Sequence, residues 1–469
     1  ARKTKHTAGG KKSRHSSSPR GRKLQQAVGD AIVEPGMPYY YDRVVVERTS
    51  PLTRELEGEE AAAEAKSRVP VQPIAQCEEV TFCDGLGNVR SWITIVSMAT
   101  QGEMLGETQS ATHAGSGGNV YMSGPSLYIA STNYDYMFDN RDVARETGIR
   151  RFGVWTAVLR FSVDAGAVAF ENLVTVPGSV LNQFSMDEYR GYFRIATTYG
   201  NMWDSTSVSS VFIYNSTGSL VGNVTGLAPG ERIYSARFMG EMAHVVTFRQ
   251  VDPLFVLDLS DPYKPLLKGE LKIPGFSDYL HPVNSTHLIG LGKDADLRGT
   301  VKGVKVSLFD VSHPQNPDEV FNVTMGSRGT YSEASWDHRA FLYHAPSNLL
   351  SFPLQLYEPT RTNEWGELVS DGAVVMYLTD SGFTKWEMVA HYDVSENEDM
   401  MWWWGGSSLR RIYRTGYMRK ATEEALFTYS QREIRVYSLP NLDKLSQANI
   451  TFPVCDGNNG FGGGPIVVF

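Results

Sequence analysis

Two nearly identical phrases, 52 residues apart, constrain the fold of this chain most. The sequence reads LFVLDLSDPYKP at 254–265 and VSLFDVSHPQNP at 306–317. Each phrase has a strand-like apolar run followed by Asp-[Leu/Val]-Ser-x-Pro-x-x-Pro, which places Asp258 and Asp310 at equivalent positions. Because proline presets φ and Asp and Ser side chains cap backbone N–H groups, each phrase predicts a strand end and a turn.

A second strand follows each of these segments and ends near a glycine. The same pattern of strands ending near a glycine recurs earlier in the chain. Gly178, Gly230, Gly275 and Gly326 are spaced by 52, 45 and 51 residues. A period of this length with four strands per unit is typical of a β-propeller blade, which repeats at about 40–50 residues. We find six units, at roughly 117–177, 179–227, 232–274, 277–325, 330–390 and 409–451.

The rest of the chain after residue 90 agrees with an all-β fold of four-stranded antiparallel blades. Runs of five to seven residues alternate apolar and polar side chains, and long helical windows are nearly absent. The run ITIVSM at 93–98 reads as a late strand of a further unit whose inner strands lie upstream. We therefore expect a ring of seven or eight blades completed by an upstream segment. The alternative is a six-bladed ring in which residues 90–98 pair with the last blade near 434–451.

Composition divides the chain into three parts. Residues 1–75 read as a disordered basic tail with a possible short helix, residues 90–452 as the propeller, and residues 453–469 as a Gly-rich extension. The first 23 residues carry nine Lys/Arg and no acid, which leaves 35 basic and 52 acidic residues elsewhere. Because phosphate affinity comes from Lys and Arg, we expect no nucleic-acid partner for this acidic body.

Five Asn-x-Ser/Thr sequons are candidate N-glycosylation sites. Three of them, in VGNVTG, VFNVTM and ANITF, place the asparagine in the closing strand of a predicted hairpin. Repeated use of one structural position favours glycosylation and secretion. The five asparagines are Asn215, Asn223, Asn284, Asn322 and Asn449.

The three cysteines and the hydropathy pattern bear on location. The six-residue spacing of Cys77 and Cys83 permits a disulfide bond, and Cys455 is left over. No run of about 18 apolar residues exists, so we expect no transmembrane segment. The chain starts at Ala1 without an apolar signal segment, and we interpret it as processed or excised.

Several longer segments resemble the secreted β-propeller-domain family of bacteria and archaea. They include GSGGNVYMSGPSLYIAST, VPGSVLNQFSMDEYRGYFRIATT, GLAPGERIYSARFMGEMAHVVTFRQVDPLFVLDLSDPYKP and LKIPGFSDYLHPVNSTHLIGLG. The hairpin phrase also looks like the short LVIVD-type repeat. The resemblance covers about residues 90–452 and implies a propeller fold and an extracellular location, but no general activity.

Signatures of catalysis and metal binding are missing or weak. The chain has no HExxH, GxSxG, GxxxxGK[ST] or paired CxxC. TDSGFTKW at 379–386 resembles the Asp box of sialidases but occurs once with an extra residue, so it predicts a hairpin turn. We interpret the scattered histidines as turn or core residues: His281, His313, His338 and His344.

Acidic loops and an aromatic cluster remain as candidate sites. KDADLRG, with Asp294 and Asp296, and DGNNG, with Asp456, offer oxygen ligands for Ca²⁺ but lack EF-hand spacing, so we predict no cofactor. The three Trp of MMWWWGGSS at 400–408 suit either a protein or sugar contact or packing between blades.

Two arginine-containing segments place charge beside the inner strands. MDEYRGYFR ends at Arg194, and GERIYSARF is its counterpart in the next unit. Such side chains line a central channel or form salt bridges and hydrogen bonds between blades, and we favour the second reading.

The sequence therefore favours a secreted, glycosylated propeller that acts as a structural or protein-interaction module of an extracellular or cell-surface assembly. The expected partners are other protein subunits, among them its own upstream cleavage product, since a protease could cut after the basic stretch that ends at Lys23. The alternative is a secreted hydrolase or lyase with a site in the propeller funnel.

Overall fold

The structure is a computed structural model of the whole chain, and its described residues fall into several ranges. They are 92–98, 108–114, 117–134, 154–164, 166–200, 205–248, 252–296, 298–361, 365–391, 411–420 and 423–450, with the backbone of 39–41 and 71–73. The predicted basic tail, apart from those short backbone stretches, and the Gly-rich extension lie outside these ranges.

Contacts divide the chain into two compact units. One comprises residues 1–118, 124–131 and 159–173, and the other comprises residues 119–123, 132–158 and 174–469. In the first unit, β3 (Trp92–Met98) pairs antiparallel with β4 (Thr108–Ala114), and β1 (Tyr39–Tyr41) pairs with β2 (Val71–Pro73). The sequence predicted β3 but not β4, because the β4 sequence TQSATHA lacks an apolar run.

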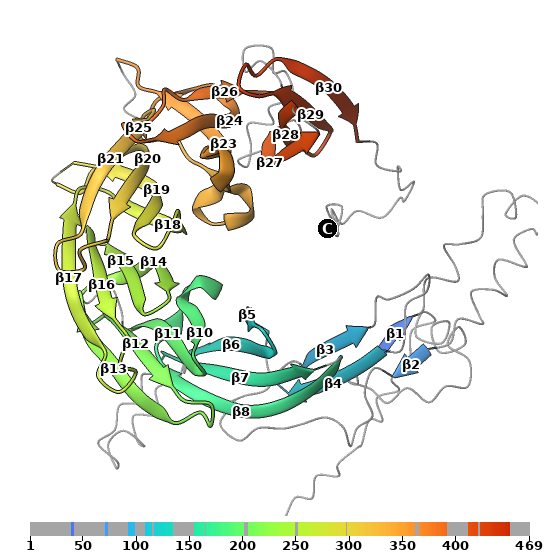
Figure 1. Cartoon of the computed structure of the whole chain (residues 1–469), viewed down its shortest axis with the longest axis vertical. Helices are drawn as coiled ribbons and strands as arrows, with labels where there is room; N and C mark the ends of the chain where they lie inside the picture. Colours follow the sequence, from blue (N-terminus) through green and yellow to red (C-terminus); the bar gives the residue numbers. More distant parts are fainter. Residues whose placement is uncertain are drawn as a thin grey trace, which may run out of the picture. The chain divides into compact units, whose positions relative to one another are not determined.

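Six sheets in the described part of the chain follow a four-strand path in chain order (Figure 1). Sheet 1 contains β5 (Asn119–Ser123), β6 (Ser126–Tyr134), β7 (Val154–Asp164) and β8 (Ala167–Pro177). Sheet 2 contains β10 (Met186–Tyr189), β11 (Tyr192–Tyr199), β12 (Val208–Tyr214) and β13 (Leu220–Leu227), with the short β9 (Ser179–Val180) against β11. Sheet 3 contains β14 (Arg232–Met239), β15 (Met242–Phe248), β16 (Asp252–Asp258) and β17 (Leu266–Ile273).

The remaining three sheets repeat this path. Sheet 4 contains β18 (Phe276–Pro282), β19 (His287–Ala295), β20 (Val301–Asp310) and β21 (Asp318–Met325). Sheet 5 contains β22 (Leu342–His344), β23 (Leu349–Glu358), β24 (Glu367–Thr379) and β25 (Gly382–Phe383), with β26 (Glu387–Val389) also on β24. Sheet 6 contains β27 (Ile412–Lys420), β28 (Glu423–Ser430), β29 (Glu433–Ser438) and β30 (Lys444–Asn449). The predicted all-β fold of four-stranded antiparallel sheets is confirmed.

The helical residues that the structure describes form short 3₁₀ turns. These turns are η2 (Gln183–Ser185), η3 (Glu333–Ser335), η4 (His338–Ala340) and η5 (Ala345–Ser347). No helix among the described residues is long and apolar enough to cross a membrane.

The middle strands of a sheet are buried on both faces, as sheet 4 illustrates. On β20, Val306 and Leu308 belong to an apolar cluster that includes Phe352 of sheet 5. Their neighbour Phe309 points to the opposite face and packs with Val256 of sheet 3. Outer strands differ, since β21 alternates exposed and partly buried residues along most of its length and β30 is exposed throughout. Each inner strand therefore needs a neighbouring sheet on both sides.

The repeated turns have the predicted geometry. The backbone N–H of Ser260 donates to Asp258 Oδ1 at 2.9 Å, and that of Ser312 donates to Asp310 Oδ1 at 2.8 Å. The four periodic glycines all have positive φ, at +93°, +86°, +92° and +65° in chain order. At Gly275, a Cβ atom would lie 2.3 Å from the carbonyl oxygen of Lys293. The period therefore reflects a turn that requires glycine.

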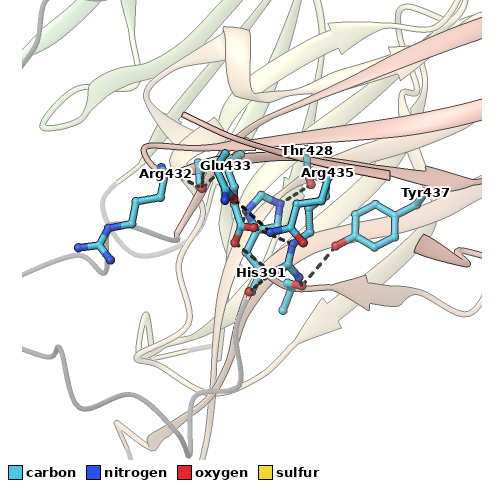
Figure 2. A network of polar contacts seen from close by, with 10 residues as sticks. His391, Thr428, Arg432, Glu433, Arg435 and Tyr437 are labelled. Carbon is cyan, nitrogen blue, oxygen red and sulfur yellow. Dashed lines mark hydrogen bonds and ion pairs between the residues drawn. The ribbon is translucent and has the colours of Figure 1, made fainter. Parts of the chain in front are cut away.

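A buried polar network joins the end of sheet 5 to sheet 6 (Figure 2). His391 Nε2 lies 2.6 Å from Thr428 Oγ1, and the Arg435 guanidinium donates to the carbonyl oxygens of Ala390 and His391. The same guanidinium forms a bidentate pair with Glu433 at 3.0 and 3.1 Å. These bonds tie the segment after β26 to β28 and β29.

The ionisation of His391 follows from this setting. Burial, with the nearby Arg435 cation, lowers its pKa from 6.5 to about 3. Glu433 Oε1 lies 3.7 Å from Nδ1 and favours the charged form, but Arg435 already neutralises that carboxylate. The imidazole is therefore neutral in the folded protein at neutral pH. Burial also lowers the pKa of His244 and His281 to about 4.

Gly275→Ala should destabilise the protein more than Gly226→Ala. Both glycines have positive φ, but a Cβ at Gly226 meets no atom within 4 Å. We expect a loss of about 1–2 kcal/mol in the free energy of unfolding for Gly226→Ala and more than about 3 kcal/mol for Gly275→Ala. Denaturant unfolding of the two variants measures the difference. Equal losses would show that the contact with the Lys293 carbonyl is unimportant.

Acidification should destabilise the protein through its buried histidines. The unfolded chain binds a proton at His391 below about pH 6.5, whereas the folded chain stays neutral until about pH 3. Protonation of His391 in the unfolded chain therefore has no effect on the free energy of unfolding well above about pH 6.5, and it lowers that free energy progressively as the pH falls. His391→Gln should make the pH dependence of the unfolding free energy shallower by roughly 1.4 kcal/mol per pH unit between pH 6 and 4.

Gln315→Ala, at an exposed position, supplies the control, because it removes no titratable group and should leave the slope unchanged in the same denaturant titrations. An unchanged slope in His391→Gln would mean that His391 binds its proton equally well in the folded and unfolded chains.

Candidate functional site

Three of the five sequon asparagines lie on the same strand of their sheets, the fourth. Asn223 lies on β13, Asn322 on β21 and Asn449 on β30, which are the fourth strands of sheets 2, 4 and 6. All three side chains are exposed. Their predicted location in closing strands is confirmed, and each is sterically open to modification.

The other two sequons lie in tight turns. Asn215 Oδ1 accepts hydrogen bonds from the backbone N–H groups of Thr217 and Ser219 at 3.1 and 2.9 Å. Asn284 Oδ1 accepts from the backbone N–H of Thr286 at 2.8 Å. These bonds use the amide oxygen, whereas an N-linked glycan attaches to the amide nitrogen.

Several other predicted sites lie outside the described residues. They are the proposed bridge between Cys77 and Cys83, Cys455, the Asp456 loop and the Trp cluster at 400–408.

The acidic loop KDADLRG serves as a turn. Asp296 Oδ1 accepts from the backbone N–H groups of Arg298 and Thr300 at 2.8 and 2.9 Å. Asp294 lies 4.0 Å from the Lys302 ammonium group. Among the described residues, no three His, Cys, Asp or Glu side chains form a group suited to a metal ion.

The TDSGFTKW segment forms the predicted hairpin turn. Thr379 pairs with Gly382, and its hydroxyl donates to the Gly382 carbonyl at 2.7 Å. The four histidines likewise have local partners. His281 lies 3.1 Å from the Tyr279 hydroxyl, His313 lies 3.0 Å from the Ser312 hydroxyl, His338 lies 3.1 Å from the Gln183 amide, and His344 stacks on Tyr417.

The inner-strand arginines connect neighbouring sheets. The buried Arg194 of β11 pairs with Asp187 of β10 and donates to the Gly240 carbonyl of sheet 3 at 2.6 Å. Arg237 of β14 donates to the Leu280 carbonyl of sheet 4 at 2.9 Å and to the Tyr279 hydroxyl at 3.2 Å. These bonds confirm the interpretation that the arginines join one blade to the next.

Asp278 on β18 is a titratable group near Lys293 and Arg232. Burial raises its pKa to about 7, although Ser335, Lys293 and Arg232 each act to lower it. The carboxyl therefore changes charge near neutral pH. Lys293 donates to the Thr330 carbonyl, and burial lowers the pKa of its ammonium group.

A long connection between sheets 4 and 5 breaks the regularity of the repeat. In sheets 3 and 4 the first strand begins within two residues of the periodic glycine, whereas fifteen residues, 327–341, separate Gly326 from β22. We call this segment the sheet-5 connection. It contains η3 and η4, and an antiparallel bridge between Tyr331 and Gln355 fixes it to β23.

The sheet-5 connection presents aromatic rings beside charged groups. Tyr331 and Trp336 stack with ring centroids 5.8 Å apart, and the Arg411 guanidinium lies 4.8 Å from the Tyr331 ring. Arg328 lies 4.3 Å from the ring of Trp365, whose carbonyl accepts from the Gly329 N–H at 2.8 Å. The sequence analysis predicted that this segment belongs to an ordinary four-stranded unit. The larger number of residues between Gly326 and the next strand was the sequence feature that could have revealed the insertion.

Solved structures give only distant similarity. The chain aligns with AztD of Citrobacter koseri at 10% identity and a TM-score of 0.40, covering 76% of this chain and 80% of that one. It aligns with the β-propeller domain of the Trilobed protease from Pyrococcus furiosus at 8% identity and a TM-score of 0.32, covering 72% and 83%. Likeness at this level supports no argument about this chain.

Two archaeal proteins are related over part of their length. An uncharacterised protein of Methanocaldococcus jannaschii is 40% identical over 200 residues, which is 42% of this chain and 30% of the relative. An uncharacterised protein of Archaeoglobus fulgidus is 39% identical over 198 residues, or 42% and 29% of the two chains. The match thus spans less than a third of either relative.

A sequence model of the β-propeller domain matches residues 40–442. This range contains sheets 1 to 5 and most of sheet 6, with the repeated turns and the arginines that join the sheets. The chain belongs to the β-propeller domain family.

Proposed function

We propose that this chain is a secreted, glycosylated β-propeller that acts as a protein-interaction module of an extracellular or cell-surface assembly. The observation that carries the proposal is the exposure of Asn223, Asn322 and Asn449 on the fourth strands of three sheets. A glycan is bulky and hydrated, so its asparagine must face solvent. Recurrence on the fourth strand of three separate sheets favours use over coincidence.

The same strands can carry glycans without loss of the core. On β21, Asn322 alternates with the inward-facing Phe321 and Val323, which pack against the apolar cluster of sheets 4 and 5. Successive side chains of a strand point to opposite faces, so a sugar on Asn322 extends away from that cluster. The hydrogen bond from Asn322 Nδ2 to Glu319 at 3.0 Å would be replaced on glycosylation.

The proposed partners are other protein subunits, and one of them is the chain's own upstream cleavage product. The support is the sheet of β3 and β4, which contains two strands among the described residues where the six sheets contain four or five. A two-stranded sheet leaves main-chain N–H and C=O groups for another strand to pair with. The partner would add strands to β3 through main-chain hydrogen bonds.

Intact mass analysis of the native particle tests the partner. We expect an upstream polypeptide to co-purify with this chain and to separate only under denaturing conditions. A single species of this chain without a co-purifying fragment would contradict the two-chain arrangement, and it would leave the glycosylation proposal standing.

Glycopeptide mass spectrometry of the native protein tests the modification. We expect glycan masses on peptides that contain Asn223, Asn322 and Asn449, and each Asn→Gln variant should lose one glycan. Asn316→Gln changes an exposed asparagine outside any sequon and should leave the glycan mass unchanged. Unmodified peptides at all five sequons would refute glycosylation and remove the main support for secretion.

A further inference from the structure

We propose that the sheet-5 connection forms a binding platform for a neutral polysaccharide chain. The platform consists of Arg328, Tyr331 and Trp336 of this connection together with the neighbouring Trp365 and Arg411. The inference goes beyond the proposed function and does not depend on glycosylation of the chain itself. It rests on the shape, exposure and charge of these side chains.

The platform presents flat apolar rings to solvent on a fixed frame. Trp336 is 64% exposed and Trp365 is 57% exposed, which are high values for a residue type that is usually well buried. Behind Trp336, Tyr331 lies in a nearly parallel plane at 19°, and its backbone is bonded to Gln355 in both directions at 2.9 and 3.1 Å. Both indole rings are therefore exposed, and Trp336 stacks on a residue whose backbone is fixed to β23.

Buried charges hold the platform from beneath. Arg411 is only 7% exposed, and it donates to Glu333 at 2.8 Å while it lies over the Tyr331 ring. Burial raises the pKa of Tyr331 to about 12, so its phenol remains neutral. Such a preorganised surface loses little conformational entropy when a ligand binds.

The exposed apolar area is too small for a stable protein partner. Two tryptophans at these exposures offer roughly 300 Å² of ring surface, given about 250 Å² for a whole side chain. A stable protein interface takes about 800 Å² from each partner, of which roughly 450 Å² is apolar. A single exposed ring instead matches the apolar face of one sugar ring.

The charges around the platform have both signs, which disfavours an ion as ligand. Asp337 pairs with Arg339 at 3.0 Å and with Arg414, and Arg411 pairs with Glu333. Beside Trp365, the paired strand ends carry Glu358 and Glu367, and Arg328 lies over the Trp365 ring. Carboxylates accept and guanidinium groups donate, and the hydroxyl groups of a neutral sugar do both. Flat rings flanked by donors and acceptors together suit such a ligand.

Affinity electrophoresis of unglycosylated recombinant protein tests the proposal. Native gels contain soluble xylan, hydroxyethyl cellulose or mannan as neutral probes, polygalacturonate as an anionic probe, or no polysaccharide. We expect retardation by at least one neutral probe. Trp336→Ala and Trp365→Ala should each weaken the association by about tenfold.

Tyr263→Ala is the matched control, because Tyr263 is an aromatic residue of similar exposure, 59%, in the turn between β16 and β17. It should leave retardation unchanged, and thermal unfolding should show all variants folded. Absence of retardation in every neutral gel, or equal retardation of Trp336→Ala and the wild type, would overturn the proposal. Retardation in polygalacturonate alone would assign an anion site instead, and Trp336-dependent self-association in sedimentation velocity would assign a protein contact.

Discussion

The middle strands of sheets 2 to 5 carry runs of buried side chains on both faces, and the rest of the structure depends on this. A strand such as β20 cannot leave either face in water, so sheet 4 must lie between sheet 3 on one side and sheet 5 on the other. The requirement passes from sheet to sheet along the chain. Hydrogen bonds then fix the position of each sheet against the next. For example, the Arg237 guanidinium of sheet 3 donates a hydrogen bond to the Leu280 carbonyl of sheet 4.

Most of the fold could be predicted because its determinants are local. Asp258 and Asp310 hold turns through bonds to residues two positions away, and the periodic glycines adopt positive φ. Such features leave a direct mark in sequence. The strand β4 leaves none, because the partly exposed strand TQSATHA needs few apolar residues and is recognised only by its pairing with β3.

The candidate sites were less predictable than the fold. The sequons carry their own motif, and their strand positions followed from the repeat. The aromatic platform has no motif, because Tyr331, Trp336, Trp365 and Arg411 come together only through tertiary contacts. The repeat period predicted a regular four-stranded unit at this place, whereas the structure has an insertion after Gly326 in place of the usual short turn. Residues that interrupt a repeat are freed from its packing and become available for binding.

The exposure of the fourth strands has a consequence for how such molecules meet one another. A strand like β30, exposed along its whole length, has an edge of main-chain groups that another sheet can extend. A hydrated sugar attached at Asn449, or at Asn223 of β13 or Asn322 of β21, would stand in the path of any strand approaching that edge. At high concentration, copies of the protein could then not pair edge to edge into continuous sheets. Contacts between copies would form through the loops at the strand ends instead.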